Sequence, residues 1–166
     1  MFRNSSMPTP KKVEDILKET KIYQILRPKC VNSPPDISLQ AALDLMRREK
    51  SGYIVIRDEH LRVLGVFNER DVLMKVLRKG VKLSEPVWKY MNSELVLLTK
   101  SDTVGTAIEA MKKYNTRHIP LVDELGQMTG VLSMRTIANF LSELIPTDVF
   151  NLPPKPDQTY NTAEGG

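Results

Sequence analysis

The chain has 166 residues, of which 41% are hydrophobic and 27% charged, an ordinary composition for a soluble globular protein. No apolar run is long enough to span a membrane, and the polar residues 1–11 lack the hydrophobic stretch of a signal peptide, so we expect a cytoplasmic protein with no membrane partner. The single cysteine, Cys30, excludes an internal disulfide, and one cysteine with two histidines offers no metal-ligand spacing.

The net charge of +4 and the pI near 9.2 would suit an anionic partner. Basic and acidic residues are nevertheless interspersed along most of the chain, and the densest basic cluster, at residues 75–82, is explained by the C-terminal end of a predicted helix. Neither a known nucleic-acid-binding motif nor an aromatic platform accompanies the charge, so a nucleic-acid partner is the weaker interpretation.

The first predicted elements are a short extended segment at residues 31–33 and an amphipathic helix after Ser38. Ser38 stands in the position from which a hydroxyl caps free backbone amides. The helix is indicated by apolar residues at the spacing i, i+3, i+4 and i+7, namely Leu39, Ala42, Leu43 and Met46. One face of this helix is therefore expected to be buried.

A β-hairpin and a second helix are predicted next. Residues 53–56 and 62–67 are rich in β-branched and aromatic side chains, and residues 58–61 between them have the composition of a turn. The second helix is expected at about residues 68–79, ending before Gly80, which can adopt the left-handed conformation that closes a helix. The order of elements is therefore β-α-β-β-α.

The same order recurs later in the chain, because residues 22–72 align without a gap with residues 87–137. Identical pairs include Ala42/Ala107, Met46/Met111, Ile54/Ile119, Asp58/Asp123, Gly65/Gly130 and Arg70/Arg135. The elements expected in the second copy are an extended segment at 96–98, a helix behind Thr103, strands at 119–122 and 128–132 with Gly126 in their turn, and a helix at 133–144.

The predicted fold class is α+β, with two β-α-β-β-α repeats packed on each other about a pseudo-twofold axis. Each repeat has only about 60 residues, too few to bury its hydrophobic face well on its own. We expect repeat 1 at residues 12–80, repeat 2 at 81–145, a disordered N-terminus at 1–11 and an extended Pro-rich tail at 146–166.

Each hairpin ends in a similar polar segment, at residues 65–71 and 130–136. Asn68 and Ser133 are predicted to cap the following helix, and Asp71 completes a capping box in the first copy. A helix N-terminus also presents free N–H groups and the positive end of the helix dipole, which attract a phosphate. An aspartate beside it could accept hydrogen bonds from two ribose hydroxyls.

These features resemble the cystathionine-β-synthase (CBS) domain, and residues 12–145 are similar to a tandem CBS pair, or Bateman module. The resemblance is carried by residues 65–71, by the Arg-His-Ile-Pro-Leu-Val segment at 117–122, and by the helix residues Met46 and Met111. It implies that adenosine compounds bind in one or both clefts between the copies and that the chain forms a homodimer.

The resemblance also implies roles for individual residues of the first cleft. Asp71 would hold the ribose hydroxyls, and Asn68 stands where the family usually has a phosphate-contacting hydroxyl residue. The adenine would lie against Asn32, Tyr53 and Ile54. The basic candidates for phosphate contacts are Arg70, Arg117, His118 and Arg135, of which His118 could add a charge that varies with pH. A strand histidine packed between the copies explains His118 equally well.

The second copy departs from the family pattern, because Thr136 stands where the ribose-binding aspartate is expected. A neutral hydroxyl cannot accept two hydrogen bonds as a carboxylate does. The expected lining of this second cleft is Leu97, Arg117, His118, Ile119, Ser133 and Thr136. We therefore predict weak or no binding there, and one competent nucleotide site per chain.

The leading hypothesis is a regulatory module that senses AMP, ADP or ATP, with S-adenosylmethionine as a further candidate and no metal. Binding would change the packing of the copies or of the dimer, and an unknown partner protein would respond. The alternative is a ligand-free structural or protein-interaction module. An enzyme is less favoured, because neither histidine, His60 or His118, has an identifiable Ser or Cys nucleophile near it.

Overall fold

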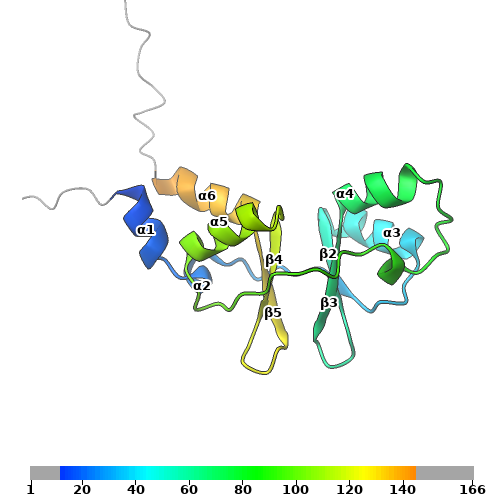
Figure 1. Ribbon diagram of the computed structural model, residues 1–166, viewed down its shortest axis with the longest axis horizontal. Helices are drawn as coiled ribbons and strands as arrows, with labels where there is room; N and C mark the ends of the chain where they lie inside the picture. Colours follow the sequence, from blue (N-terminus) through cyan, green and yellow to red (C-terminus); the bar gives the residue numbers. More distant parts are fainter. Residues whose placement is uncertain (1–11, 145–166) are drawn as a thin grey trace, which may run out of the picture.

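The computed structural model describes residues 12–144, so the predictions for residues 1–11 and for the tail from residue 146 lie outside the described part. Figure 1 shows two halves side by side, each with a β-hairpin toward the middle and helices around it. The first half contains β1 (Asn32–Ser33), α3 (Leu39–Glu49), β2 (Tyr53–Arg57), β3 (Val63–Asn68), α4 (Glu69–Asp71) and the π-helical turn η1 (Val72–Leu77). The second contains α5 (Val104–Lys113), β4 (His118–Val122), β5 (Met128–Ser133) and α6 (Met134–Leu144).

Strand pairing within each half follows the duplicated sequence. β1 is parallel to β2, with Asn32 opposite Val55, and β2 is antiparallel to β3. β4 and β5 form the second hairpin, and Leu98 makes a parallel bridge with Leu121 that corresponds to the β1–β2 pairing. The predicted order of elements and the α+β fold class are confirmed.

The predicted helix caps are also confirmed in both repeats. Ser38 Oγ accepts a hydrogen bond from Ala41 N–H at 3.1 Å, and Thr103 Oγ1 accepts one from Thr106 N–H at 3.1 Å. Each hydroxyl satisfies an amide that has no partner inside its helix. No helix within residues 12–144 combines the length and the apolar character that crossing a membrane requires.

The N-terminal segments of the two repeats exchange places between the halves. Helices α1 (Val13–Glu19) and α2 (Ile22–Ile25), which were not predicted, pack on the second half, where α1 lies beside α5 (Figure 1). The Ile22 side chain is fully buried in the second core. Conversely, the 3-10 turn η2 (Val87–Lys89) packs on the first half, where Val87 is fully buried.

Main-chain hydrogen bonds hold the exchanged segments in place. Val104 N–H donates to Thr20 O at 2.9 Å, and Leu39 N–H donates to Glu85 O at 2.8 Å. Each half is therefore completed by the N-terminal segment of the other repeat. The repeat bounds 12–80 and 81–145 stay a prediction, and the packing units in the structure are interleaved.

Side-chain alternation along β2 serves two cores. Ile54 and Ile56 point into the core of the first half. Val55 between them points the other way and, with Val66 of β3, packs against Val131 of the second sheet. A main-chain hydrogen bond also joins the halves: the N–H of Met128 in β5 donates at 2.9 Å to the carbonyl oxygen of residue 61 in the β2–β3 turn. The predicted packing of the two repeats on each other is confirmed.

Candidate functional site

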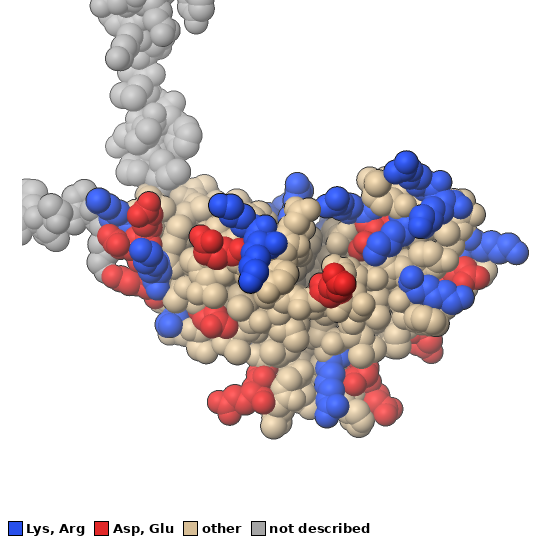
Figure 2. Space-filling view, in the orientation of Figure 1, with Lys and Arg blue, Asp and Glu red and all other residues tan. Residues whose placement is uncertain are grey.

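An open cavity of about 970 Å³ lies between the two halves, at the strand ends opposite the hairpin turns. The residues that line it before β5 in the sequence are Arg27, Lys29, Leu43, Met46, Arg47, Lys50, Ser51, Gly52, Tyr53, Glu69, Val72, Leu73, Arg117 and His118. The lining is completed by Val131, Ser133, Met134, Arg135 and Thr136. In Figure 2, Lys and Arg are most numerous along the upper right side of the molecule, and both acidic and basic side chains stand near the hairpin turns below.

Two aromatic residues at equivalent positions of the repeats meet in this lining. Tyr53 begins β2 and His118 begins β4, and their ring centroids are 4.4 Å apart, with planes inclined by 37°. Burial, and then the nearby Cys30, raise the pKa of Tyr53 to about 12. Burial, and then the charge of Arg117, lower the pKa of His118 to about 4. Both rings are therefore neutral at pH 7, and His118 is not expected to supply a phosphate with positive charge there.

The start of α6 forms another part of the cavity wall. Ser133 Oγ accepts a hydrogen bond from Thr136 N–H at 3.1 Å and lies 3.0 Å from Thr136 Oγ1. Met134 N–H donates to Arg117 O at 2.8 Å, which places the Arg117 backbone beside this helix start. The cavity thus meets the positive end of a helix together with Arg117 and Arg135, a combination that suits an anion.

The carboxylate of Asp71 is occupied by neighbours in its own half. Asp71 Oδ2 accepts a hydrogen bond from Asn68 N–H at 3.1 Å, and Asn68 Oδ1 accepts one from Asp71 N–H at 3.1 Å, so the predicted capping box is present. Asp71 Oδ1 lies 2.8 Å from Lys75 Nζ, which also donates to Tyr90 O at 2.9 Å. Neither Asp71 nor Asn68 lines the cavity. The ribose role of Asp71 stays a prediction. It requires the carboxylate either to break its ion pair with Lys75 or to accept hydrogen bonds from the ribose while that ion pair remains.

The structure divides the predicted site residues into two groups. The cavity lining includes Tyr53, Arg117, His118, Ser133, Arg135 and Thr136. Arg70, on α4, does not line the cavity, and Ile54 is fully buried in the first core. Asn32 Oδ1 accepts a hydrogen bond from Arg57 Nε at 3.0 Å and also lies away from the lining. Among the residues named for the second cleft, Ile119 is fully buried and Leu97 is 42% exposed, and neither lines the cavity.

Four basic residues of the lining were not predicted: Arg27, Lys29, Arg47 and Lys50. Arg27 and Lys29 lie in the irregular segment between α2 and β1, where no periodic pattern marks a function. Lys50 ends α3 with a φ of 48°, in the left-handed region that ordinary side chains avoid. The equivalent residue of the second repeat, Asn115, has the same φ, and no pattern in the sequence marks Lys50 as part of a site.

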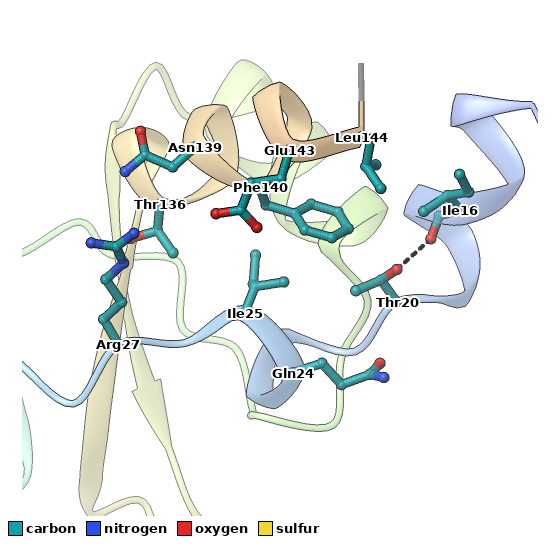
Figure 3. A pocket seen from close by; sticks show the side chains of 10 residues that line it. All are labelled: Ile16, Thr20, Gln24, Ile25, Arg27, Thr136, Asn139, Phe140, Glu143 and Leu144. Atoms are coloured by element: carbon teal, nitrogen blue, oxygen red, sulfur yellow. Dashed lines mark hydrogen bonds between the residues drawn. The ribbon is translucent and has the colours of Figure 1, made fainter. Parts of the chain in front are cut away.

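A smaller cavity of about 450 Å³ adjoins the first one between α2 and α6. Its lining shares Arg27 and Thr136 with the larger cavity, and Figure 3 shows Arg27 extending from the segment after α2 toward Thr136 and Asn139. Phe140 and Ile25 contribute the apolar part of its wall. Arg27 therefore stands where the two cavities meet.

The donors available in the described residues favour an organic anion over a metal ion. Within residues 12–144, no group of three or more His, Cys, Asp or Glu side chains is placed to hold a metal. The lining of the larger cavity contains six Lys or Arg side chains and one carboxylate, that of Glu69. Such a lining attracts negative charge, and the Tyr53–His118 pair beside it offers neutral ring surface to a planar group.

A family model for the CBS domain matches the chain twice, at residues 22–78 and 87–143. These two ranges coincide with the duplicated sequence and with the two hairpins that face each other across the interface. The chain therefore belongs to the CBS domain family and contains two CBS domains in tandem.

Individual proteins show the same relationship at moderate identity. An uncharacterised 17.7 kDa protein of Acidianus ambivalens is 28% identical over 125 residues, which cover 75% of this chain and 75% of that protein. Inosine-5'-monophosphate dehydrogenase of Aquifex aeolicus is 27% identical over 135 residues, which cover 80% of this chain but only 26% of the dehydrogenase. A solved structure of a CBS domain protein from Pyrobaculum aerophilum, complexed with AMP, is 28% identical with a TM-score of 0.66, covering 75% of this chain and 97% of that chain.

Proposed function

We propose that this chain is a regulatory module that binds an adenosine nucleotide in the cavity shared by its two repeats. The observation that carries the proposal is the lining itself: one cavity of about 970 Å³ combines six basic side chains, an aromatic pair and a helix N-terminus, drawn from both repeats. Support also comes from the Pyrobaculum aerophilum relative, whose structure is a complex with AMP. AMP, ADP and ATP are the first candidates, and S-adenosylmethionine is a further one.

The chemistry of the lining suggests how such a ligand would lie. The adenine would rest near the neutral rings of Tyr53 and His118, whose stacking surface tolerates a purine. The phosphates would meet Arg117 and Arg135 at the start of α6, where bidentate guanidinium contacts and the positive end of the helix dipole favour negative charge. The ribose would lie near the hydroxyl groups of Ser133 and Thr136, unless the ligand uses the cleft of Asp71.

Regulation would follow from the position of the cavity between the halves. A ligand that touches both halves has an affinity that depends on how they are placed, so its binding favours one placement over others. Val55, Val66 and Val131 pack tightly where the halves meet, so a ligand that changes the placement of the halves would act on this packed contact. We propose that a partner protein binds differently to the two placements of the halves, or to two arrangements of a homodimer of the chain that depend on them.

Isothermal titration of the full chain with AMP, ADP, ATP, S-adenosylmethionine and adenosine tests the proposal. At least one phosphorylated nucleotide should bind saturably, and Tyr53→Ala should weaken that binding about tenfold through the loss of aromatic contact. Tyr23→Ala is the matched control, because Tyr23 is 60% exposed and does not line the cavity. Absence of binding heat at millimolar concentrations of every ligand would reject the proposal in favour of a ligand-free interaction module.

Asp71→Ala distinguishes the two clefts in the same titration. If the ligand lies in the shared cavity, this variant should keep its affinity, since Asp71 does not line that cavity. If the ribose binds at Asp71 as the family resemblance implies, the variant should lose binding. Size-exclusion chromatography with light scattering, with and without the ligand that binds, then measures whether the dimer changes.

A further inference from the structure

We propose that the shared cavity contains a subsite for a chain of three or more phosphates, so that a nucleoside triphosphate or longer polyphosphate is favoured over a monophosphate. This inference rests on the proposed function, because it names the ligand class of the same cavity. Four of the six basic residues concerned, Arg27, Lys29, Arg47 and Lys50, lie outside the motifs by which the sequence resembles its family.

The basic side chains form two groups, one at the end of α3 and one at the start of α6. The α3 group consists of Lys29, Arg47 and Lys50, since the Lys29 ammonium donates to the Glu49 carbonyl at the end of α3. The α6 group consists of Arg27, Arg117 and Arg135, at or beside the first turn of α6. α3 belongs to the first half and α6 to the second. A single phosphate can meet one group, whereas a longer chain can meet both.

Most of these cations have no counter-charge within the part of the chain that the structure describes. Among residues 12–144, no ion pair involves Arg27, Lys50, Arg117 or Arg135. Arg47 is the exception, because it pairs with Asp44 on the exposed side of α3. Like charges around one cavity repel each other, and a bound polyanion relieves that repulsion. A monophosphate carries about −2 and a triphosphate about −4 at pH 7, so the longer chain matches the lining better.

The six basic residues of the lining can be compared with the residues at the equivalent positions of the other repeat. At the six equivalent positions of the other repeat stand Asn92, Glu94, Lys112, Asn115, Gly52 and Arg70, which are two basic residues and one acidic residue. The basic lining is therefore not a general consequence of the duplicated fold. Its surplus of positive over negative side chains also exceeds the net charge of the entire chain, +4. The charge is concentrated at this cavity.

Thr136 fits the same assignment. An aspartate at this position, as in Asp71 of the first repeat, would place a carboxylate in the wall beside Arg135 and at the positive end of α6. A carboxylate there would repel a phosphate chain and compensate the dipole that attracts it. The neutral hydroxyl of Thr136 leaves both Arg135 and the dipole of α6 free to attract a phosphate. Threonine at this position therefore removes a ribose contact but strengthens the attraction for phosphate.

Lys50 offers the sharpest test, because replacing it with asparagine is expected to weaken polyphosphate binding without lowering the stability of the fold. Its φ of 48° is a conformation that asparagine tolerates better than lysine, and Asn115 occupies the equivalent position with the same φ. Lys50→Asn should therefore maintain or raise the melting temperature while removing one charge of the α3 group. A loss of affinity in this variant cannot be attributed to unfolding.

The experiment is titration of the full chain with AMP, ATP and inorganic tripolyphosphate, without divalent ions, at low and at moderate salt. ATP should bind at least about tenfold more tightly than AMP, with the steeper loss of affinity on adding salt. Lys50→Asn and Arg135→Gln should each weaken ATP and tripolyphosphate about threefold to tenfold, and Lys50→Asn should leave AMP within twofold. Arg70→Gln is the matched control for Arg135→Gln, since it removes the equivalent arginine of the other repeat.

The outcomes separate this inference from the proposed function. Equal affinity for AMP and ATP, or an equal effect of Arg70→Gln and Arg135→Gln on ATP, overturns the polyphosphate subsite and leaves nucleotide binding standing. Binding of tripolyphosphate as tight as that of ATP, with no competition by AMP or adenosine, supports the subsite and rejects an adenosine-specific module. Failure of both ATP and tripolyphosphate to bind overturns the subsite directly.

Discussion

Tyr53 and His118 occupy equivalent positions in the two repeats and bring their rings to 4.4 Å from each other across the interface. The imidazole of His118 is partly buried there and lies near the charge of Arg117. Burial and this charge both disfavour its protonated form and lower its pKa. A residue that ordinarily titrates near neutrality is therefore held neutral at the centre of the proposed ligand site. Protonation of His118 should weaken the packing of the two halves.

The first prediction concerns the pH dependence of stability. The pKa of His118 is lowered from 6.5 to about 4 in the folded chain, so between these values the unfolded chain binds more protons and stability rises with pH. The contribution lost on acidification through this window is at most about 3 kcal/mol, and His118 adds no pH dependence well above pH 6.5. Urea unfolding of the wild type and of His118→Phe at pH 4.5, 5.5 and 7 measures it.

His60→Gln is the matched control for this measurement, because its side chain is 67% exposed in the β2–β3 turn. The His118→Phe variant should show a flatter profile between pH 4.5 and 6.5 than the wild type, and His60→Gln should not. A wild-type slope that His118→Phe leaves unchanged would assign the effect to other groups.

The second prediction concerns the interleaved halves. Ile22 lies outside the second repeat in sequence but is fully buried in the second core, so Ile22→Ala should cost about 3 kcal/mol of unfolding free energy. The adjacent Tyr23→Ala should cost less than about 0.5 kcal/mol, since Tyr23 is largely exposed. Denaturant unfolding followed by circular dichroism provides both values. Similar small costs for the two variants would contradict the interleaved packing.

The third prediction concerns the capping box of Asp71. Asp71→Ala removes the acceptor of the Asn68 amide and the carboxylate partner of Lys75, and should cost about 1–2 kcal/mol. Thr136→Ala, at the equivalent position, should cost less, because Ser133 Oγ continues to cap the Thr136 amide. Equal costs in urea unfolding at pH 7 would show that the ionic and capping contacts of Asp71 add nothing to stability.

The fourth prediction concerns the lone thiol. Burial raises the pKa of Cys30 to about 11, and Cys30 Sγ lies 3.6 Å from Met128 Sδ at the interface. Because the thiolate is the reactive form, alkylation by iodoacetamide at pH 8 should be roughly a hundredfold slower in the folded chain than in urea. The rates are measured by mass spectrometry. Comparable rates in the two states would mean that the interface does not shield this thiol.

Local sequence signals predicted most of the regular elements because their causes are local. The helical spacing of Leu39, Ala42 and Met46 and the capping hydroxyl of Ser38 act within one or two turns, so α3 was expected where it lies. Helix α2 was not expected, because four residues show no periodicity and depend on burial of Ile22 in the other half. The same reason applies to η2.

The site was predicted only where its residues belong to a repeated motif. Ser133, His118 and Arg117 were named from the hairpin and helix segments, and the structure places them in one cavity. Arg27, Lys29 and Lys50 belong to connecting segments and were missed, since no local pattern brings them together. Asp71 was named from its motif, but its ion pair with Lys75, a local contact four residues apart on one helical segment, was not predicted.

The amino-acid sequence by itself determined that this chain is a duplicated CBS unit with capped helices and paired hairpins, because those features depend on neighbours a few positions away or on direct comparison of its two copies. Only the tertiary structure decided which segment completes which half and which charges meet around the shared cavity. Such contacts join residues far apart in the chain, and their free energy depends on burial and charge that arise only after the two halves have packed.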